Sequence, residues 1–154
     1  MILNDEGRMS NGDITKDDET GMQSKAYFLN CLDDFLVLRG EKGLLAVCAP
    51  DVPEEEKEKI TRAMAGRGFD YTTHYRSQCG DIFAGAIVSD KTTFEAKAIE
   101  LRDELSKGIQ TKYGVATVHI TDNDTREKAQ EVLSKLEAHA YTAIGRQPTQ
   151  QPAP

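Results

Sequence analysis

The middle of the chain reads as a β-hairpin whose second strand is apolar on both faces. Residues 69–76 alternate, with Phe69, Tyr71, Thr73 and Tyr75 on one face and Asp70, Thr72, His74 and Arg76 on the other, which is typical of a half-exposed strand. A polar turn with a glycine follows at 77–81, and an unbroken apolar segment runs over 82–88. An apolar strand of this kind belongs in the centre of a sheet.

The flanking segments supply helices and strands in an order that predicts the fold class. Helical periodicity is expected over 24–38, from Pro53 to 65, over 94–105 and after residue 127, and further strands are expected over 44–49 and 113–120. The order is a helix followed by β-α-β-β-α-β-α. Its core is the βαββαβ plan of ferredoxin-like and palm folds, an α+β class with helices on an antiparallel sheet. An N-terminal helix precedes this core and a C-terminal helix follows it.

Local motifs suggest where these elements begin and end. Gly40 and Gly43 are predicted to flank a turn before the first strand, and Asp51 is predicted to cap the following helix. Two residue pairs have the spacing of a capping box, namely Thr92 with Glu95 and Asp124 with Glu127. The first helix is apolar on more than one side, so it packs either within its own core or also against a second chain.

The composition divides the chain into a folded part and two tails. Residues 1–23 carry six acidic and two basic residues, a net charge of −4, and few large apolar groups, so a flexible acidic arm is expected there. Residues 147–154 read as a disordered Pro/Gln tail, which leaves 24–146 as one domain. No apolar run approaches the ~20 residues of a membrane helix, so a cytoplasmic location is expected.

Charge and cysteine usage exclude several functions. The net charge of −7 and the lack of clustered basic residues argue against nucleic acid as a partner. Cys31, Cys48 and Cys79 form no CxxC pair, so neither a zinc site nor a disulfide framework is expected. The three histidines lie on separate predicted elements without an acid at helical spacing, and isolated surface or boundary positions are expected for all of them: His74, His119 and His139.

Four motifs in order resemble those of GGDEF domains, the palm-like fold of diguanylate cyclases. Residues 79–84, Cys-Gly-Asp-Ile-Phe-Ala, are similar to the hairpin Gly-Gly-Asp-Glu-Phe-Ala of the family. The other three similar segments are the helix at 25–32, the strand at 113–116 and the helix at 136–143 with Gly-Arg after it at 145–146. The resemblance spans about 25–146 and implies a place in cyclic dinucleotide signalling.

The resemblance also implies a two-metal site that this chain does not reproduce. In active members, carboxylates after the first strand and at the hairpin hold the metal ions, but those positions fall here at Cys48, Pro50 and Ile82. Asp81 alone remains, and one carboxylate is a poor magnesium site. We therefore expect Asp81 to be a turn residue that bonds to its own backbone, and Asp51, about three residues late, to cap a helix.

Nucleotide contacts implied by the family are also incomplete. A match to the Arg-x-x-Asp motif of the family's inhibitory site occurs at Arg67 and Asp70. It lies about three residues too far from the hairpin tip. The alternative to a nucleotide contact is that Arg67 simply follows the end of a helix and that Asp70 lies on the exposed face of a strand. The position of the family's phosphate-binding lysine is occupied here by Ile144. The first glycine of the family's hairpin motif is replaced by Cys79, whose side chain is expected to crowd a turn at which phosphate approaches the backbone. The candidate nucleotide-binding residues are Arg67, Asp70, Cys79, Gly80 and Asp81.

Three functional hypotheses follow. The first is a catalytically inactive GGDEF-like regulatory module without a cofactor, which binds a protein partner or a nucleotide such as GTP or a cyclic dinucleotide. The second is a divergent nucleotide cyclase that uses Mg²⁺ held by Asp51 and Asp81. The third is a ferredoxin-like interaction protein that works through its acidic arm and first helix. A homodimer through that helix is compatible with each hypothesis.

Overall fold

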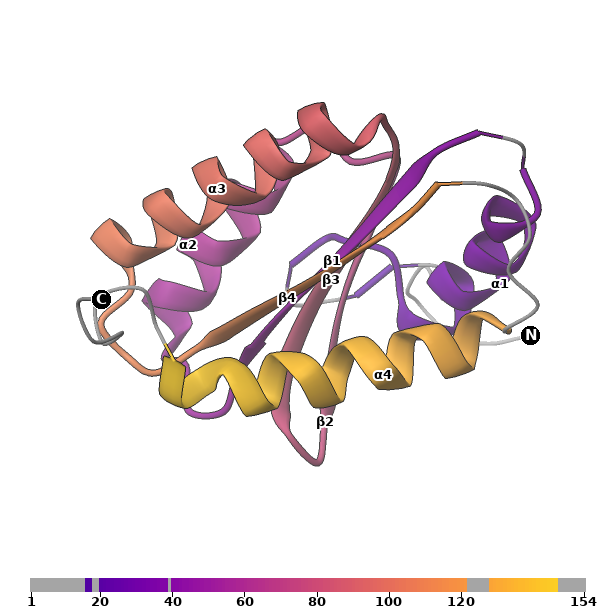
Figure 1. Cartoon of the computed structure of the whole chain (residues 1–154). Coiled ribbons are helices and arrows are strands. Elements are labelled where there is room, and N and C mark those ends of the chain that lie inside the picture. Colours follow the sequence, from indigo (N-terminus) through magenta and orange to yellow (C-terminus); the bar gives the residue numbers. More distant parts are fainter. Residues whose placement is uncertain (1–15, 18–19, 39, 122–127, 147–154) are drawn as a thin grey trace, which may run out of the picture.

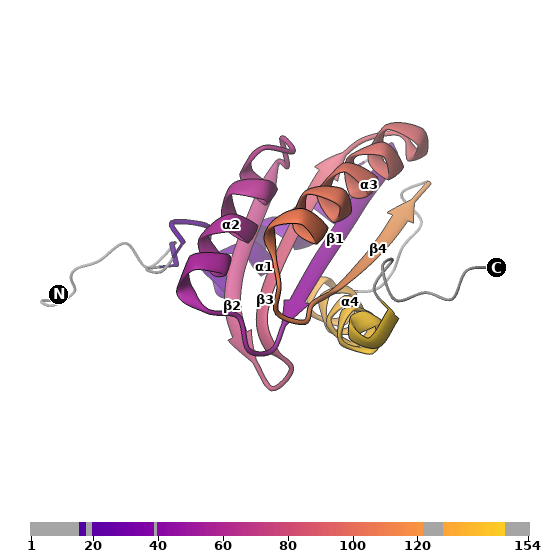
Figure 2. The ribbon, with the colours of Figure 1, turned by 90° about the vertical axis from the view of Figure 1, so that its left-hand side faces the viewer.

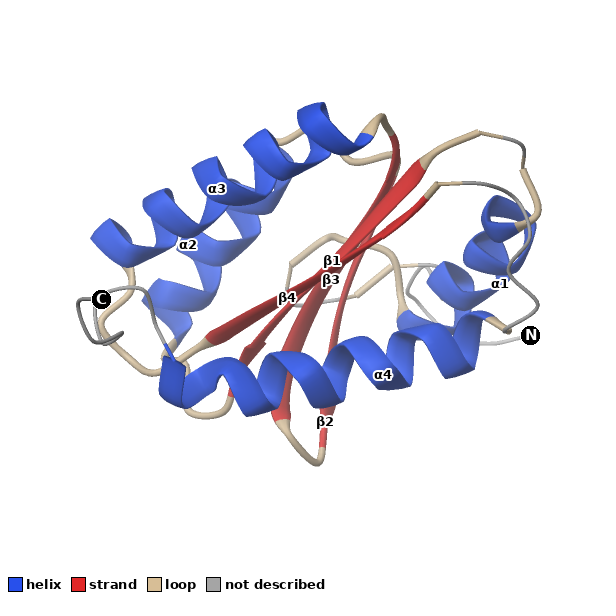
Figure 3. Ribbon diagram, in the orientation of Figure 1, coloured by secondary structure: helices blue, strands red, loops and turns tan. Residues whose placement is uncertain are grey.

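The computed structural model describes residues 16–17, 20–38, 40–121 and 128–146, which form an antiparallel sheet between two pairs of helices (Figure 1). The elements are α1 Lys25–Leu36, β1 Lys42–Ala49, α2 Glu54–Ala65, β2 Tyr71–Ser77, β3 Gly80–Val88, α3 Lys91–Gly108, β4 Gly114–Ile120, α4 Ala129–Thr142 and a 3₁₀ turn Ala143–Arg146 (Figure 3). The predicted order and the α+β class are confirmed. No helix in these ranges has the length and apolar character needed to cross a membrane.

The sheet has the strand order β2-β3-β1-β4, so the two most apolar strands lie in its centre. Every residue of β1 is buried, because helices cover both faces of the sheet. Leu45 and Val47 pack in the cluster beneath α2 and α3, whereas Leu44 and Ala46 pack in the cluster beneath α1 and α4. Figure 2 shows α2 and α3 over one face, and Figure 1 shows α1 and α4 on the other.

The helices bury the stripes that their periodicity predicts. On α3 the buried residues are Phe94, Ala98, Leu101 and Leu105, and on α4 they are Ala129, Val132, Leu133, Leu136 and Ala140. The α1 stripe of Phe28, Leu32, Phe35 and Leu36 is buried within the domain. At the end of α1 Val37 and Leu38 are exposed.

Several predicted boundaries are wrong. Gly43 lies inside β1 rather than in a turn. A Cβ there would come within 2.3 Å of the Phe94 ring, so glycine is required for the close approach of this ring to the strand. Asp51 does not cap α2, whose N-cap is Pro53 without a side-chain hydrogen bond. The exposed Asp51 side chain therefore has no capping role.

Two capping predictions have different outcomes. The N-cap of helix α3 is Asp90, two residues earlier than expected, and its side chain accepts a hydrogen bond from the Thr93 amide, so the Thr92–Glu95 prediction is wrong. Helix α4 begins after Lys128, whose backbone amide donates a hydrogen bond to the Glu131 carboxylate at 3.0 Å. The predicted pair Asp124 and Glu127 lies outside the described residues.

A short N-terminal segment lies along the outer edge of β2. We call residues 16–17 and 20–23 the strap; they belong to the stretch for which a flexible acidic arm was predicted, and the rest of that stretch lies outside the described residues. The Gln23 amide donates to the Thr72 carbonyl at 3.0 Å, and the Thr73 hydroxyl donates to the Gln23 carbonyl at 2.8 Å. Met22 is buried in the core beneath α2 and α3. The strap thus adds a short parallel bridge to the edge of the sheet.

Candidate functional site at the hairpin

The tip of the β2–β3 hairpin is closed by its own side chains and by the neighbouring loop. Ser77 pairs with Gly80 across a two-residue turn, and the Ser77 hydroxyl accepts a hydrogen bond from the Cys79 amide at 3.0 Å. Gly80 has a φ of 109°, and a Cβ there would come within 2.3 Å of the Pro50 Cα. Glycine is therefore required for turn geometry and for close contact with the β1–α2 connection. The same surface of Gly80 is not open to a ligand.

Asp81 begins the buried part of β3 and lies among cations, not in a turn. Its side chain is 12% exposed, and one of its oxygens, Oδ2, is 2.9 Å from the His74 Nε2 and 3.3 Å from the Lys57 Nζ. The exposed Arg76 reaches the other oxygen, with Nε 3.7 Å from Oδ1. The prediction that Asp81 bonds to its own backbone is wrong, because pairing in β3 turns its side chain toward α2 and β2.

Lys57 carries a buried ammonium group against this carboxylate. Its side chain is only 5% exposed, and Nζ also lies 3.7 Å from the exposed Glu54 carboxylate. A charge at this depth is stable only when it is paired. Lys57 is not among the site residues predicted from the sequence. Its spacing to Ile60 and Met64 nevertheless places it in the buried stripe of α2.

His74 joins Asp81 to the strap. The ring is 1% exposed and packs on Phe83 with 4.7 Å between ring centroids. Its Nδ1 lies 2.9 Å from the Asp17 Oδ2, and its Nε2 lies 2.9 Å from the Asp81 Oδ2. Each ring nitrogen of His74 therefore lies within hydrogen-bond distance of one carboxylate.

The surface position expected for His74 is therefore wrong. Alternation placed it on the polar face of β2 correctly, but that face is covered by α2 and by the strap. Its acidic partners lie 57 residues before it and 7 residues after it, so no local spacing identifies both. The other two histidines differ: His139 is exposed, and His119 Nε2 lies 2.9 Å from the Ser89 carbonyl.

Asp17 is the second residue that the sequence did not reveal. Its Oδ2 accepts hydrogen bonds from the Thr20 amide at 2.9 Å and from the Thr20 hydroxyl at 2.8 Å. Burial alone raises the pKa of Asp17, but the bonds from Thr20 and His74 outweigh it, and the pKa lies below its ordinary value. Asp17 is therefore held as an anion against His74.

The residues at the family's metal positions do not fit a two-metal site. Cys48 is buried, its thiol donates to the Cys79 carbonyl at 3.1 Å, and burial is the main reason that its pKa rises to about 12. Such a thiol stays protonated at neutral pH and is a poor metal ligand. Ile82 has no lone pair, and Asp51 is exposed whereas Asp81 is buried among cations. Within the described ranges, no group of three or more acidic, histidine or cysteine residues is arranged to hold a metal.

The Arg-x-x-Asp residues both have structural contacts. Arg67 is half-buried, and its guanidinium binds the carboxylates of Glu100 and Glu104 on α3. The Asp70 carboxylate accepts a hydrogen bond from the Val88 amide at 2.9 Å. The two side chains therefore bind different elements, and their role in binding a nucleotide stays a prediction, as it does for Cys79, Gly80 and Asp81.

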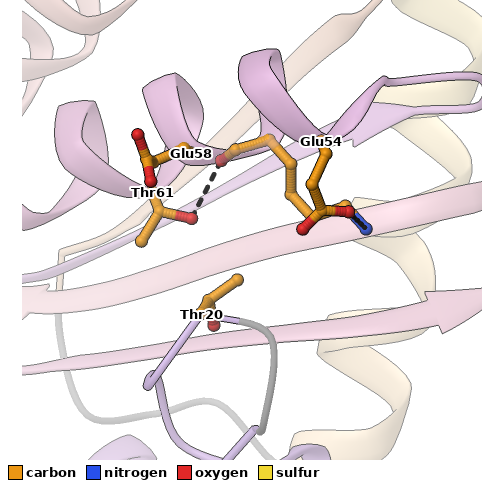
Figure 4. Close-up of a pocket in the computed structure, with 5 residues that line it drawn as sticks. Thr20, Glu54, Glu58 and Thr61 are labelled. Carbon is orange, nitrogen blue, oxygen red and sulfur yellow. Dashed lines mark hydrogen bonds and ion pairs between the residues drawn. The ribbon is translucent and has the colours of Figure 1, made fainter.

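A polar cavity opens beside the charged cluster. Its volume is about 180 Å³, and it lies between the strap and α2, lined by Thr20, Glu54, Lys57, Glu58 and Thr61 (Figure 4). Lys57 belongs both to the cavity wall and to the Asp81 ion pair. The cavity therefore borders the buried cluster at Lys57.

Comparison with known proteins identifies the fold. No family model matches the sequence, and no curated protein matches it. Among solved structures, the GGDEF domain of FimX from Pseudomonas aeruginosa matches with a TM-score of 0.65 at 17% identity, over 84% of this chain and 93% of that one. The coiled-coil and GGDEF structure of DgcB from Caulobacter crescentus, in complex with c-di-GMP, matches with a TM-score of 0.61 at 11% identity, over 80% of this chain and 77% of that one.

A third structure is a longer protein. LapD of Vibrio cholerae, an S helix-GGDEF-EAL chain bound to c-di-GMP, matches with a TM-score of 0.55 at 14% identity, over 80% of this chain and 32% of that one. The chain therefore has the fold of GGDEF domains, as its sequence motifs predicted.

Proposed function

We propose that this chain is a catalytically inactive GGDEF-like regulatory module that acts by binding a nucleotide or a protein partner. The observation that carries the proposal is the Lys57 ammonium, 3.3 Å from the one carboxylate that remains of the family's metal set. A divalent ion at Asp81 would meet two cations that already contact this carboxylate, Lys57 and Arg76, and would have to displace the ring of His74. Like charges at such distances repel strongly in a buried site.

The nucleotide hypothesis rests on the fold and on the proteins that share it. Two of the similar structures hold c-di-GMP. We propose GTP or a cyclic dinucleotide as the ligand and the cytoplasm as the location. A protein partner, or a second copy, would use the exposed end of α1 with Val37 and Leu38.

The direct experiment is turnover with GTP and Mg²⁺. Purified protein is incubated with excess nucleotide, and products are separated by ion-exchange chromatography, with an Asp81→Ala variant in parallel. We expect no cyclic dinucleotide from either protein. Product that forms with the wild type and disappears with Asp81→Ala would overturn the proposal.

Ligand binding is measured separately by thermal shift with GTP, ATP and c-di-GMP. A ligand that binds only the folded state raises the melting temperature in proportion to RT ln(1 + [L]/Kd). Arg67→Lys keeps the charge at the predicted contact and Asp51→Asn serves as the exposed control. A nucleotide that shifts the wild type and the control but not Arg67→Lys would support the predicted site.

A further inference from the structure

Two cysteines meet at the tip of the β2–β3 hairpin. Cys48 lies next to the end of β1, and its buried thiol donates a hydrogen bond to the Cys79 carbonyl at 3.1 Å. Cys79 lies in the two-residue turn between Ser77 and Gly80, and its half-buried side chain packs against the core cluster that contains Cys48. Both thiols are free. A buried thiol therefore lies beside a thiol that is only partly covered.

The hydrogen bond limits the distance between the two residues. Two covalent bonds, of about 1.23 and 1.52 Å, separate the bonded oxygen from the Cα of Cys79, so the Cys48 sulfur lies within about 6 Å of that Cα. In a disulfide, whose S–S bond is about 2.04 Å long, a sulfur lies about 4 Å from the Cα of its partner. This distance must therefore shorten by at most about 2 Å for a disulfide to form.

The two sulfur atoms also interact electrostatically. Burial is the main reason that the pKa of Cys48 is raised, and the charge of an ionised Cys79 raises it further. The third cysteine, Cys31, lies on a different element, within α1.

We propose that Cys79 is a site of reversible oxidation by peroxide, and that Cys48 resolves the oxidised form through an intramolecular Cys48–Cys79 disulfide. The proposal goes beyond the proposed function, because it requires neither a nucleotide nor a protein partner. In reducing compartments, disulfides are typically transient and redox-sensing.

The oxidation takes two steps. In the first, the Cys79 sulfur attacks one oxygen of hydrogen peroxide, the O–O bond breaks, and the departing hydroxide leaves with the thiol proton as water; Cys79 becomes a sulfenic acid. In the second, the Cys48 sulfur attacks the Cys79 sulfur, the S–O bond breaks, and the hydroxide leaves with the Cys48 proton as a second water. The two thiols together lose two electrons and two protons, and one peroxide is reduced to two waters.

Burial assigns the two roles. The pKa of Cys48 is about 12, so this thiol reacts slowly with any reagent that arrives from solvent. The second step needs no such reagent, because the sulfenic acid forms on the residue that Cys48 already contacts. A sulfenic acid without a neighbouring thiol is instead open to further oxidation to sulfinic acid.

The experiment is oxidation of the full, folded chain with equimolar hydrogen peroxide, followed by alkylation in denaturant and mass spectrometry of tryptic peptides. Cleavage after lysine and arginine places Cys31, Cys48 and Cys79 in three different peptides, 26–39, 43–57 and 77–91. We expect peptides 43–57 and 77–91 to be recovered as one disulfide-linked species that dithiothreitol separates, and Cys31 to be alkylated. The matched control Cys31→Ser should form the same linked species at the same rate.

Two variants test the assigned roles. Cys48→Ser should leave Cys79 as a sulfenic acid that dimedone labels. Cys79→Ser should form no linked species and should leave Cys48 unoxidised; because its substitution lies in the half-buried turn, it keeps the proposal testable if Cys48→Ser folds poorly.

Four results would overturn the proposal. The first is the absence of the linked species from folded wild type, and the second is its formation only after the chain has been unfolded. The third is a link between two chains, seen as a dimer on a non-reducing gel. The fourth is oxidation of Cys48 in Cys79→Ser, which would show that peroxide reaches the buried thiol directly.

Discussion

Substitution of Asp81 by asparagine tests whether the buried cluster is a structural ion-pair network. The change keeps the shape of the side chain and removes its charge. Lys57 and His74 would then face a neutral amide, with the ammonium only 5% exposed and unable to recover its hydration. The variant therefore isolates the electrostatic contribution of one carboxylate.

The magnitude follows from burial. Removing one partner of a buried ion pair costs about 3–5 kcal/mol, because the remaining charge is left uncompensated. The contact with Arg76 adds little, because that side chain is 66% exposed and solvent screens it. The amide oxygen of asparagine retains part of the hydrogen bonding, so we expect a loss of about 3 kcal/mol in the free energy of unfolding.

The assay is urea unfolding followed by circular dichroism at pH 7, with the m-value checked for a two-state transition. Lys57→Met removes the cation but leaves Asp81 with His74, so a smaller loss of about 2 kcal/mol is expected. The Asp81→Asn/Lys57→Met double variant should lose clearly less than the sum of the two single variants. Asp51→Asn, at an exposed site, should change stability by less than about 0.5 kcal/mol.

The reasoning would be refuted by a loss below about 1 kcal/mol for Asp81→Asn, or by strictly additive single variants. A gain in stability would be more informative still. It would mean that Asp81 repels other carboxylates in the folded protein, which is the behaviour of a metal-binding site without its metal.

Three other predictions follow from local contacts. Gly80→Ala should destabilise the protein by more than about 2 kcal/mol in urea unfolding, because φ is positive and the new Cβ meets Pro50; an unchanged midpoint would contradict this. The hydrogen bond from Thr111 holds the pKa of Glu56 below its ordinary value of 4.5, so its contribution to stability is present at neutral pH and is lost as the pH falls through this lowered pKa. Glu56→Gln should flatten the acidic part of the stability profile, and an unaltered profile would count against it. The Cys48 thiol, with a pKa of about 12 instead of 9.0, should react with iodoacetamide about 1000-fold more slowly than an ordinary thiol at pH 8; rapid native-state labelling seen by mass spectrometry would be inconsistent with its burial.

The fold could be predicted because its determinants are local and periodic. The apolar run of β1 and the buried stripes of α3 and α4 depend on spacings of two and of three to four residues, which are visible in a single sequence. The boundaries were less accurate. Asp51 and Thr92 are good capping residues by type, yet Pro53 and Asp90 hold the cap positions, because tertiary packing sets where each helix begins.

The site could be predicted only in part. The hairpin and Asp81 were located by motif, but the partners of Asp81 come from α2, β2 and, through His74, from the strap. Such contacts over long sequence separations leave no periodic pattern. Lys57 is the exception, because a lysine in the inward stripe of a helix indicates a buried counter-ion. Asp17 belongs to a stretch whose composition predicts an unstructured arm. Its place in the site is visible only in the structure, through its hydrogen bonds with Thr20 and His74.

The most direct measurement of the central claim is Mn²⁺ binding followed by electron paramagnetic resonance, with wild type and Asp81→Asn side by side. If Lys57 neutralises Asp81, the two proteins will show the same weak, non-stoichiometric binding. One Mn²⁺ bound per wild-type chain, and lost in Asp81→Asn, would show that this carboxylate is a metal ligand after all.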